Sequence, residues 1–313
     1  MMQSFGHIPV LLSESLSFLS PVSGGTYLDG TLGMGGHAEA ILEAGSPDSR
    51  LVGIDRDREA LAAAQRRLSR FADRFISVHG DFRDAVELLR QQDIAALDGA
   101  ILDLGVSSYQ FDTPERGFSY GHDAPLDMRM DRSGGTTARD VVNGYTQPEL
   151  AQVIRTYGEE RWAARIAQFI VRERERVPIE TTGQLADIIR KAIPAGARRT
   201  GPHPARRTFQ ALRIEVNQEL RGLEEAVESI AGLLNPGARL CVISFHSLED
   251  RAVKTAMRRM ENPCTCPRSA PVCVCGRKPI GKASPRGAVE PRPEETESNP
   301  RARSARMRVF EKY

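Results

Sequence analysis

A group of glycines beside an aspartate lies where a predicted strand leads into a predicted helix. Residues 29–37 read Asp-Gly-Thr-Leu-Gly-Met-Gly-Gly-His, between a short apolar stretch and an Ala-rich amphipathic stretch. A glycine-rich turn that opens a helix brings backbone N–H groups and the positive end of the helix dipole close to a bound nucleotide. The segment therefore predicts a site for a cofactor that contains adenosine.

The spacing of these glycines decides between two kinds of cofactor. Gly33-Met34-Gly35-Gly36 does not match the Gly-x-Gly-x-x-Gly pattern that cradles a dinucleotide pyrophosphate. Asp29, at the expected strand end, suits a positively charged ligand group better than a phosphate. S-adenosylmethionine carries an ammonium and a sulfonium, so the residues favour it, and an NAD-dependent oxidoreductase is the alternative.

Further ligand-type residues follow the next predicted strands. Asp55 ends the apolar segment LVGID, about 20 residues past the glycine loop, as expected of an acid that binds both ribose hydroxyls. Phe82 follows a third strand (75–80) and could lie against an adenine ring. A fourth strand (99–108) contains Asp103. Acids at successive strand ends predict a doubly wound parallel sheet that binds its ligand along the carboxyl edge.

Each of these residues also has a purely structural interpretation. Asp55 alone fits a helix N-cap equally well, and Phe82 alone fits the core. His37 alone fits a surface position in the first turn of a helix. Their joint arrangement in chain order is what favours the cofactor site.

The composition is that of a globular protein. The chain has 313 residues, of which 40% are hydrophobic and 27% are charged, which allows one large domain or two ordinary ones. Residues 1–19 interrupt their apolar run with Ser, Glu and His, unlike a signal peptide, and no stretch approaches the roughly 18 apolar residues of a membrane span. We expect a soluble, cytoplasmic protein without a membrane partner, and the sequence leaves its oligomeric state open.

Positive charge is concentrated in a few segments although the net charge is only +2. Residues 190–213 contain seven basic residues and no acidic one, and further basic residues lie within 277–282 and 301–308. A solvated surface is the simpler interpretation, but unbalanced charge on one segment favours phosphate binding. We therefore expect a nucleic acid partner, with four candidate RNA contacts: Arg198, Arg199, Arg206 and Arg207.

A long insertion separates the fourth predicted strand from the next one, at 239–245. About 130 residues lie between them, too many for a single crossover connection. The insertion opens with a Gly- and Asp-rich stretch (115–135) that lacks any periodicity and predicts a loop. Capping boxes then start helices at Thr146 and Thr181, and a longer helix is predicted over 204–230. We accordingly divide the chain into a first core part (1–111), an inserted helical substrate-recognition subdomain (112–205) and a second core part with a basic, Cys-containing C-terminal segment (206–313).

The last core elements are predicted from short patterns. Ser247, after the fifth strand, is a good N-cap with Asp250 at the third helical position. His246 is expected to make a structural hydrogen bond, with substrate contact as the alternative. The chain closes with a predicted edge strand at 307–311.

Four of the five cysteines lie close together in the C-terminal region. Cys264-x-Cys266 and Cys273-x-Cys275 could bind zinc through four thiolates in a reducing compartment. Structural zinc sites usually place two to four residues between paired cysteines, so free thiols in a surface loop are the expectation and no metal is assigned. Cys241 lies within the fifth strand and is expected in the core.

Ten segments of the chain, in order, resemble the RsmH (formerly MraW) family. Its members are bacterial small-subunit rRNA methyltransferases that methylate the exocyclic N4 of a cytidine in the decoding region. The resemblance covers nearly the whole chain, and several of the motifs are long and unusual. The segments are DGTLGMGGH, GIDRD, HGDF, LDLGVSSYQFD, RGFSY, PLDMRMD, YGEER, HPARRTFQALRIEVNQEL, SFHSLEDR and NPRARSARMRV.

The resemblance implies an α/β fold, that of a class I S-adenosylmethionine-dependent methyltransferase, whose Rossmann-like parallel sheet carries an inserted helical subdomain. It implies 16S rRNA as the substrate, within the small ribosomal subunit. One departure is Arg206, where the family pattern usually has Thr, and this change removes a hydroxyl and adds positive charge. The implied cofactor contacts are Gly35, Gly36, His37, Asp55, Phe82, Asp103 and Gln110.

The implied substrate sets the chemistry. The lone pair of a cytosine N4 amine is delocalised into the ring, so catalysis depends on aligning the amine with the methyl–sulfur bond and on acceptors for its N–H groups. We expect Asp103, with Ser107 and Ser108 nearby, to border the methyl group and the target base.

The target base must leave its stack to reach such a site. Tyr109, Phe111 or Phe118 is a candidate to stack on it, with packing within the loop as an equal alternative. Two other functions stay open at this stage. They are S-adenosylmethionine-dependent methylation of another RNA or a protein, and a non-catalytic RNA-binding role in ribosome assembly.

Overall fold

A computed structural model describes residues 9–198, 203–267 and 272–313. The chain forms two compact units. The sheet unit comprises Met1–Gly105 and Gly222–Tyr313, and the helical unit comprises Val106–Arg221. These bounds differ from the expected division at 111/112 and 205/206, because the helix that begins at Arg206 packs with the helical unit. Arg199, one of the candidate RNA contacts, lies outside the described residues.

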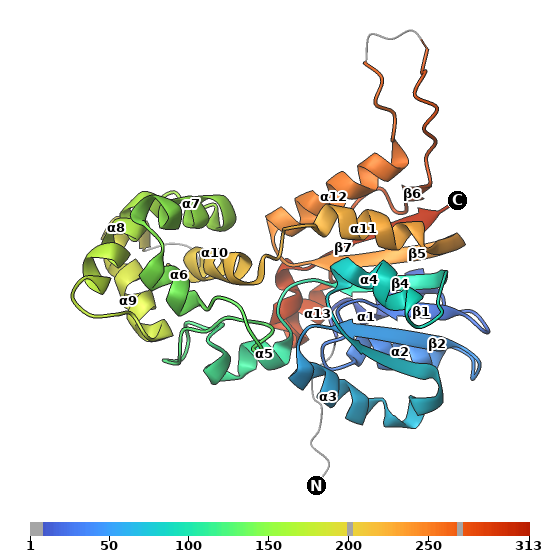
Figure 1. The fold of residues 1–313 in the computed structure, drawn as a ribbon, viewed down its shortest axis with the longest axis horizontal. Helices are drawn as coiled ribbons and strands as arrows, with labels where there is room; N and C mark the ends of the chain where they lie inside the picture. Colours follow the sequence, from blue (N-terminus) through green and yellow to red (C-terminus); the bar gives the residue numbers. More distant parts are fainter. Residues whose placement is uncertain (1–8, 199–202, 268–271) are drawn as a thin grey trace. The chain divides into compact units, whose positions relative to one another are not determined.

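The sheet unit is built on a seven-stranded sheet of order β3-β2-β1-β4-β5-β7-β6 (Figure 1). The first five strands in this order pair in parallel, and β7 pairs antiparallel with both β5 and β6. The predicted parallel sheet is therefore present. The segment predicted as an edge strand is not at the edge, because β6 covers it. The strands are β1 (Thr26–Asp29), β2 (Arg50–Asp55), β3 (Phe75–His79), β4 (Leu97–Asp103), β5 (Leu234–Ser244), β6 (Gly281–Ala283) and β7 (Arg306–Lys312).

Helices cover both faces of this sheet. Buried side chains of α1, α2 and α3 form one apolar cluster with the sheet, while α11 contacts both α4 and α12 (Figure 1). Right-handed crossovers explain the two layers, since the chain runs from β1 outward to β3 and then returns through β4 to β5. The helices of this unit are α1 (Leu12–Leu19), α2 (Gly36–Ala44), α3 (Arg58–Arg67), η1 (Ser69–Arg74), η2 (Phe82–Asp84), α4 (Ala85–Arg90), α11 (Leu223–Gly232), α12 (Ser247–Glu261), α13 (Pro293–Ser298) and η5 (Pro300–Ser304).

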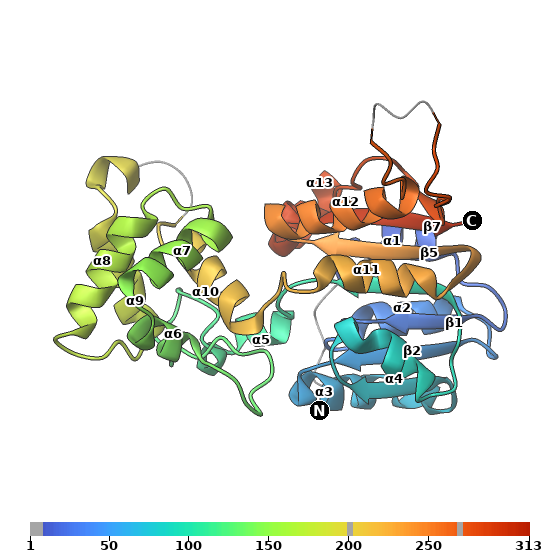
Figure 2. The same ribbon diagram turned by 45° about the horizontal axis from the view of Figure 1, so that its top comes forward.

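The helical unit is a separate bundle with its own core (Figure 2). Capping boxes start two of its helices at Thr146 and Thr181, as predicted. Apolar side chains from other helices of the bundle, such as Ile166 and Leu212, are fully buried. Among the described residues of both units, no helix is long and apolar enough to cross a membrane. The helices are α5 (Ser108–Asp112), η3 (Pro114–Arg116), α6 (Ala138–Gly144), α7 (Gln147–Gly158), α8 (Ala163–Arg174), α9 (Thr182–Ala192), η4 (Ala195–Arg198) and α10 (Arg206–Asn217).

The long helix predicted over 204–230 is wrong, because two helices stand in its place. Helix α10 ends at Asn217, the next residue, Gln218, has a left-handed backbone with φ of 49°, and Gly222, with φ of 70°, caps α11. Left-handed residues interrupt the helical hydrogen-bond ladder. The amphipathic pattern continued across the break because both helices bury one face.

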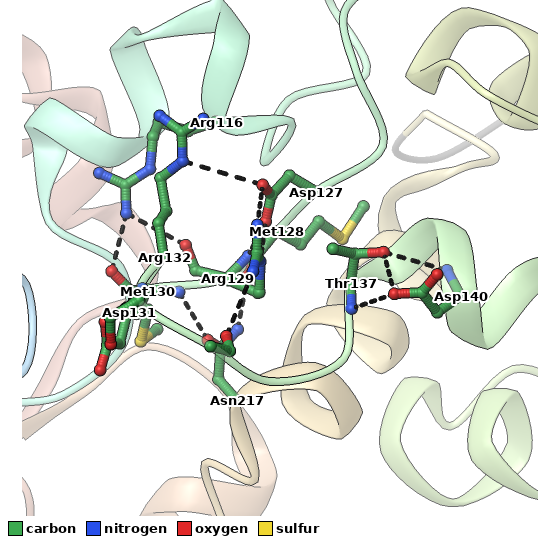
Figure 3. A network of polar contacts seen from close by, with 12 residues as sticks. Arg116, Asp127, Met128, Arg129, Met130, Asp131, Arg132, Thr137, Asp140 and Asn217 are labelled. Atoms are coloured by element: carbon green, nitrogen blue, oxygen red, sulfur yellow. Dashed lines mark hydrogen bonds and ion pairs between the residues drawn. The ribbon is translucent and has the colours of Figure 1, made fainter.

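The stretch 115–135 is an ordered loop held by buried polar groups (Figure 3). Arg116 is 1% exposed and donates hydrogen bonds to the carbonyls of Arg129 and Met130, at 3.0 and 2.8 Å. Asn217, from α10, accepts from the N–H of Met130 at 2.8 Å and donates to the carbonyl of Met128 at 2.7 Å. A chain without periodicity is thereby fixed by side chains that satisfy its backbone.

Candidate active site

Three aspartates end adjacent strands at the carboxyl edge of the sheet. Asp29 ends β1, Asp55 ends β2 and Asp103 ends β4. The register is parallel, with Asp29 opposite Ile101 and Gly53, so the three strand ends lie along one edge of the sheet. This is the juxtaposition that the sequence predicted.

The glycine loop between β1 and α2 follows the edge of the sheet closely. A Cβ at Gly30 would collide with the side chain of Leu102, and one at Gly36 would lie 2.5 Å from Cγ of Pro9. Gly35 caps α2 with φ of 77°, a conformation that glycine adopts at little cost. The loop therefore needs glycine at these positions for steric reasons, whatever it binds.

Asp29 ties this loop to the helix that follows. Its side chain is 2% exposed, and its carboxylate accepts from the N–H groups of Thr31, at 3.2 Å, and Ala38. Burial raises its pKa to about 7, and the nearby charge of Asp55 adds to the rise. The N-terminus of α2 and the backbone donors oppose that rise.

Asp55 fixes the other side of the loop. One carboxylate oxygen accepts from the N–H of Gly33 at 2.7 Å and the other from the N–H of Asp57 at 2.8 Å. The N-cap of α3 is Asp57, so the N-cap interpretation of Asp55 is wrong. Burial raises the pKa of Asp55 to about 6. Each oxygen keeps a second lone pair, and the carboxylate can therefore still accept from ribose hydroxyls.

Asp103 lies in the most unfavourable electrostatic environment of the three. Burial raises its pKa to about 8, and the charges of Asp29 and Glu249 add to the rise. Its Oδ1 is buried and has no hydrogen-bond partner among the described residues, while Oδ2 lies 3.9 Å from Nδ1 of His37. Its backbone N–H donates to the hydroxyl of Thr31 at 2.5 Å, which holds the strand end against the loop.

His37 is buried, so the surface position that fits this residue taken alone is wrong. It is 6% exposed, and its Nε2 lies 3.1 Å from the carbonyl of Val10. Burial lowers its pKa to about 4. A neutral ring that donates from Nε2 to this carbonyl leaves Nδ1 as an acceptor facing Asp103. His37 therefore supplies no positive charge to the aspartates near neutral pH.

The start of α12 supplies a buried acid that the sequence analysis missed. The N-cap of α12 is His246, whose Nδ1 accepts from the N–H of Glu249 at 3.3 Å, so the predicted N-cap at Ser247 is wrong by one residue. Glu249 is 1% exposed and accepts from the N–H groups of Phe245, at 2.9 Å, and His246. The motif SFHSLEDR contains this capping box one residue earlier than the predicted one.

A cavity of about 690 Å³ opens at the carboxyl end of β5 in the sheet unit. Its lining includes four basic side chains and His246. Of its two acidic residues, Asp250 pairs with Arg308 and Glu290 pairs with Arg306. The surplus of positive charge suits phosphate groups. The basic residues of the lining are Arg251, Lys254, Arg303 and Arg306.

A model of the MraW methylase family matches residues 4–313. The chain belongs to this family. It is 55% identical to the "Ribosomal RNA small subunit methyltransferase H" of Symbiobacterium thermophilum over 309 residues, which is 99% of this chain and 97% of that protein. The protein of the same name from Geobacter sp. strain M21 is 53% identical over 99% of this chain and 100% of its own. A solved S-adenosylmethionine-dependent O-methyltransferase of Thermotoga maritima is similar with a TM-score of 0.39 and 9% identity, over 99% of this chain and 69% of that one.

Family membership confirms the predicted family, the methyltransferase fold and S-adenosylmethionine as the cofactor of this methylase. The residues at the sheet edge fit that cofactor. Burying a carboxylate without a cationic partner is costly, and the pKa values of Asp29, Asp55 and Asp103 are raised accordingly. The ammonium and sulfonium of S-adenosylmethionine would supply the missing positive charge, and the partnerless Oδ1 of Asp103 offers an acceptor.

Phe82 of this methylase lies beside the glycine loop. It begins η2 and is partly exposed, and a Cβ at Gly30 would lie 3.2 Å from its own Cβ. It is therefore not a fully buried core residue.

The remaining predicted site residues of this methylase lie in the helical unit. Ser107 and Gln110 form the capping box of α5, with the Ser107 hydroxyl accepting from the N–H of Gln110 at 3.3 Å. Gln110 is 4% exposed. The side chain of Ser108, the third candidate for catalysis, lies outside the described part. Tyr109 and Phe111 are 37% and 41% exposed.

Phe118 is not available to a flipped base. It is 6% exposed and belongs to the core of the helical unit. Its expected alternative role, packing within the loop, is the one that it has.

The basic segment of this methylase separates into paired and exposed residues. Arg213 forms two hydrogen bonds of 2.8 Å with Glu219, and Arg190 pairs with Asp187, so these two charges are compensated. The side chains of three candidate RNA contacts are exposed on the helical unit: Arg198, Arg206 and Arg207.

Proposed function

We propose that this methylase transfers the methyl group of S-adenosylmethionine to small-subunit rRNA, on N4 of a cytidine in the decoding region of 16S rRNA. The single observation that carries the proposal is the row of three aspartates at the sheet edge, one buried and two partly buried, whose raised pKa values call for a cationic ligand. Two relatives that are 55% and 53% identical are named small-subunit rRNA methyltransferases, which supports the substrate class.

The charge distribution also supports an RNA substrate. Arg198, Arg206 and Arg207 lie exposed on the helical unit, and the cavity at the end of β5 has a basic lining. Lys and Arg side chains position RNA through its phosphates and add affinity without sequence information. A methylase that acts on proteins or small molecules would gain little from these surfaces.

The cofactor residues follow from the geometry of the loop. We assign the ribose hydroxyls to Asp55, the adenine face to Phe82 and the methionyl ammonium to the region of Asp103. Gly35 and Gly36 let the backbone approach the ligand, and the buried ring of His37 supports the same wall. Gln110 stays a candidate contact from the family resemblance.

The reaction forms an N4–carbon bond and breaks the methyl–sulfur bond. When bound, the cofactor supplies an electrophilic methyl group. The amine loses one proton in the process, and the carboxylate of Asp103 is our candidate acceptor because its Oδ1 has no partner among the described residues. The positive charge of the bound cofactor favours the ionised form of this carboxyl, which is the form that can accept a proton. Ser107 and Ser108 stay candidates for further contacts to the base.

The direct test is a methylation assay with purified protein. Unmodified 16S rRNA and small subunits that contain it are incubated with S-adenosylmethionine, then digested and analysed by mass spectrometry. We expect N4-methylcytidine at one position of the decoding region. Methyl groups on carbon, on another nucleotide, or only on protein would contradict the proposal, and RNA binding without transfer would favour an assembly factor.

Asp103→Asn tests the proton acceptor within the same assay. Loss of a general base lowers kcat by about 10²- to 10⁴-fold, measured with saturating cofactor. Asp48→Asn is the control, because Asp48 is exposed and lies between α2 and β2, away from the carboxyl edge. An unchanged kcat for Asp103→Asn would remove Asp103 from the reaction.

A further inference from the structure

Four cysteines meet between two segments that leave the sheet unit after α12 and return to β6. We call these segments, 262–267 and 272–280, the cysteine arms; Figures 1 and 2 show them side by side. At their base, the N–H of Asn262 donates to the carbonyl of Arg258 and the N–H of Ile280 to that of Met260. Beyond the base, Val272 and Val274 are 70% and 85% exposed. Burial of these two side chains therefore does not hold the arms together.

The sulfur atoms have the spacing of a metal site. Sγ of Cys273 lies 3.5 Å from Sγ of Cys264, 3.9 Å from Sγ of Cys266 and 3.5 Å from Sγ of Cys275. All four Sγ atoms lie within 4.8 Å of one another. A tetrahedral zinc site with Zn–S bonds of about 2.3 Å places its sulfurs about 3.8 Å apart. A disulfide needs about 2.05 Å between its sulfurs, and the four cysteines are free thiols.

The one-residue spacing within each pair is compatible with this geometry. In an extended chain, the side chains of residues i and i+2 point to the same side. Cys264 with Cys266, and Cys273 with Cys275, can thus each present two sulfurs from one arm. Two sulfurs from each arm complete the set of four.

Backbone N–H groups point at the sulfurs, as expected around a thiolate centre. The N–H of Val274 donates to Sγ of Cys266 at 3.3 Å. The N–H of Cys266 donates to Sγ of Cys264. The N–H groups of Thr265 and Arg277 donate to Sγ of Cys275. Such contacts orient metal ligands and offset their negative charge.

We propose that Cys264, Cys266, Cys273 and Cys275 bind one zinc ion that clamps the two arms together. Four thiolates in a tetrahedron select zinc or iron among the common metals. Zinc binding forms four metal–sulfur bonds and releases the thiol protons, with no change in oxidation state. The site is separate from the aspartates of the sheet edge, so the proposal does not rest on the proposed function.

Metal content tests the site directly. The full chain is purified under reducing conditions without added metal, with thiols trapped on lysis, and its metals are measured by mass spectrometry. We expect one zinc per chain, and Co²⁺ exchanged into the site should give the absorption bands of tetrahedral thiolate coordination. Iron in place of zinc, no metal after re-addition of Zn²⁺, or disulfides between the trapped cysteines would each overturn the proposal.

Two variants separate the cluster from the rest of the chain. Cys264→Ser should weaken zinc binding by more than about a hundredfold. Replacing a residue that only hydrogen-bonds to a metal ligand already lowers metal affinity about 10- to 100-fold. Cys241→Ala, in the core of β5 and away from the arms, should retain one zinc. Full zinc content in a Cys264→Ser/Cys275→Ser double variant would refute the assignment.

Limited proteolysis supplies a second measurement that does not depend on a variant. Removal of zinc by a chelator should speed tryptic cleavage after Arg277 by at least about tenfold, because the arms lose their clamp. Zn²⁺ alone should restore the slower rate. Equal rates with and without the metal would show that the cluster does not hold the arms.

Discussion

The proton on Asp103 should be coupled to cofactor binding. Burial and two neighbouring acids raise the pKa of this carboxyl to about 8, so at pH 7 about 0.9 of the molecules carry the proton, since the ratio of protonated to ionised forms is about 10 to 1. A cationic ligand favours the ionised form. Binding of S-adenosylmethionine at pH 7 should therefore release about 0.9 proton from Asp103, in addition to any from Asp29.

The same coupling predicts how strongly a substitution of Asp103 lowers the affinity for S-adenosylmethionine at two pH values. The ionised fraction of Asp103 rises about tenfold from pH 6 to pH 7, so the affinity that depends on it rises about tenfold as well. Asp103→Asn has no carboxyl to ionise. The loss of affinity that it causes should thus be about ten times larger at pH 7 than at pH 6, where the wild-type group is almost wholly neutral.

Titration calorimetry in buffers of different ionisation enthalpy measures both quantities. We expect Asp103→Asn to release about 0.9 fewer protons at pH 7 than the wild type, and Asp48→Asn to match the wild type at both pH values. A loss of affinity that is the same at pH 6 and pH 7, with unchanged proton release, would refute the assignment of Asp103 to the cationic group.

The raised pKa also fixes the sign of the pH dependence of stability. Without ligand, folded Asp103 keeps its proton up to about pH 8, whereas the unfolded group loses it near pH 4. The folded state therefore binds more protons in this window, and the free energy of unfolding falls as pH rises through it. The thermal shift produced by S-adenosylmethionine should grow from pH 6 to pH 7 for the same reason.

Three further variants test the cofactor, RNA and loop contacts. Asp55→Ala should weaken S-adenosylmethionine binding by about one to two orders of magnitude, the scale of lost charge-assisted hydrogen bonds, and unchanged affinity in calorimetry would remove the ribose role. Replacing Arg198, Arg206 and Arg207 by Glu should weaken rRNA binding and flatten its salt dependence by about two logarithmic units per decade of salt, while cofactor affinity stays the same; an unaltered slope would place the RNA elsewhere. Asn217→Ala should lower the free energy of unfolding in urea by at least about 2 kcal/mol, because it leaves buried backbone groups without partners, whereas the exposed Gln152→Ala should change it by less than about 0.5 kcal/mol.

Sequence patterns located the strand-end acids because the relevant information is local. Asp29, Asp55 and Asp103 each follow an apolar run, and the parallel sheet follows from the alternation of strands and helices. Capping boxes at Thr146 and Thr181 are likewise contained within four residues. Where a pattern and its consequence lie in one short segment, the sequence suffices to predict it.

Contacts between distant segments were outside the reach of such patterns. No local pattern around Arg116 or Asn217 indicates that their side chains form hydrogen bonds with the backbone of the loop 115–135. Asn217 and its partner Met128, for example, lie 89 residues apart in the sequence. The hydrogen bond from Gly33 to Asp55 and the approach of Glu249 to Asp103 depend in the same way on the folded sheet. Strand β6 has only three residues, too few to show any alternation.

The row of aspartates is better explained by ligand binding than by the stability of the fold. Asp29 and Asp55 make backbone hydrogen bonds that order the glycine loop, so these two carboxylates have a structural role as well. Within the part of the chain that the structure describes, Asp103 makes no such bond through Oδ1, and its charge is opposed by two other acids. Residues that cost stability in the free protein are typical of sites where function requires them. A cation at this edge turns that unfavourable charge into binding energy, which is the property that a methylase with a sulfonium donor requires.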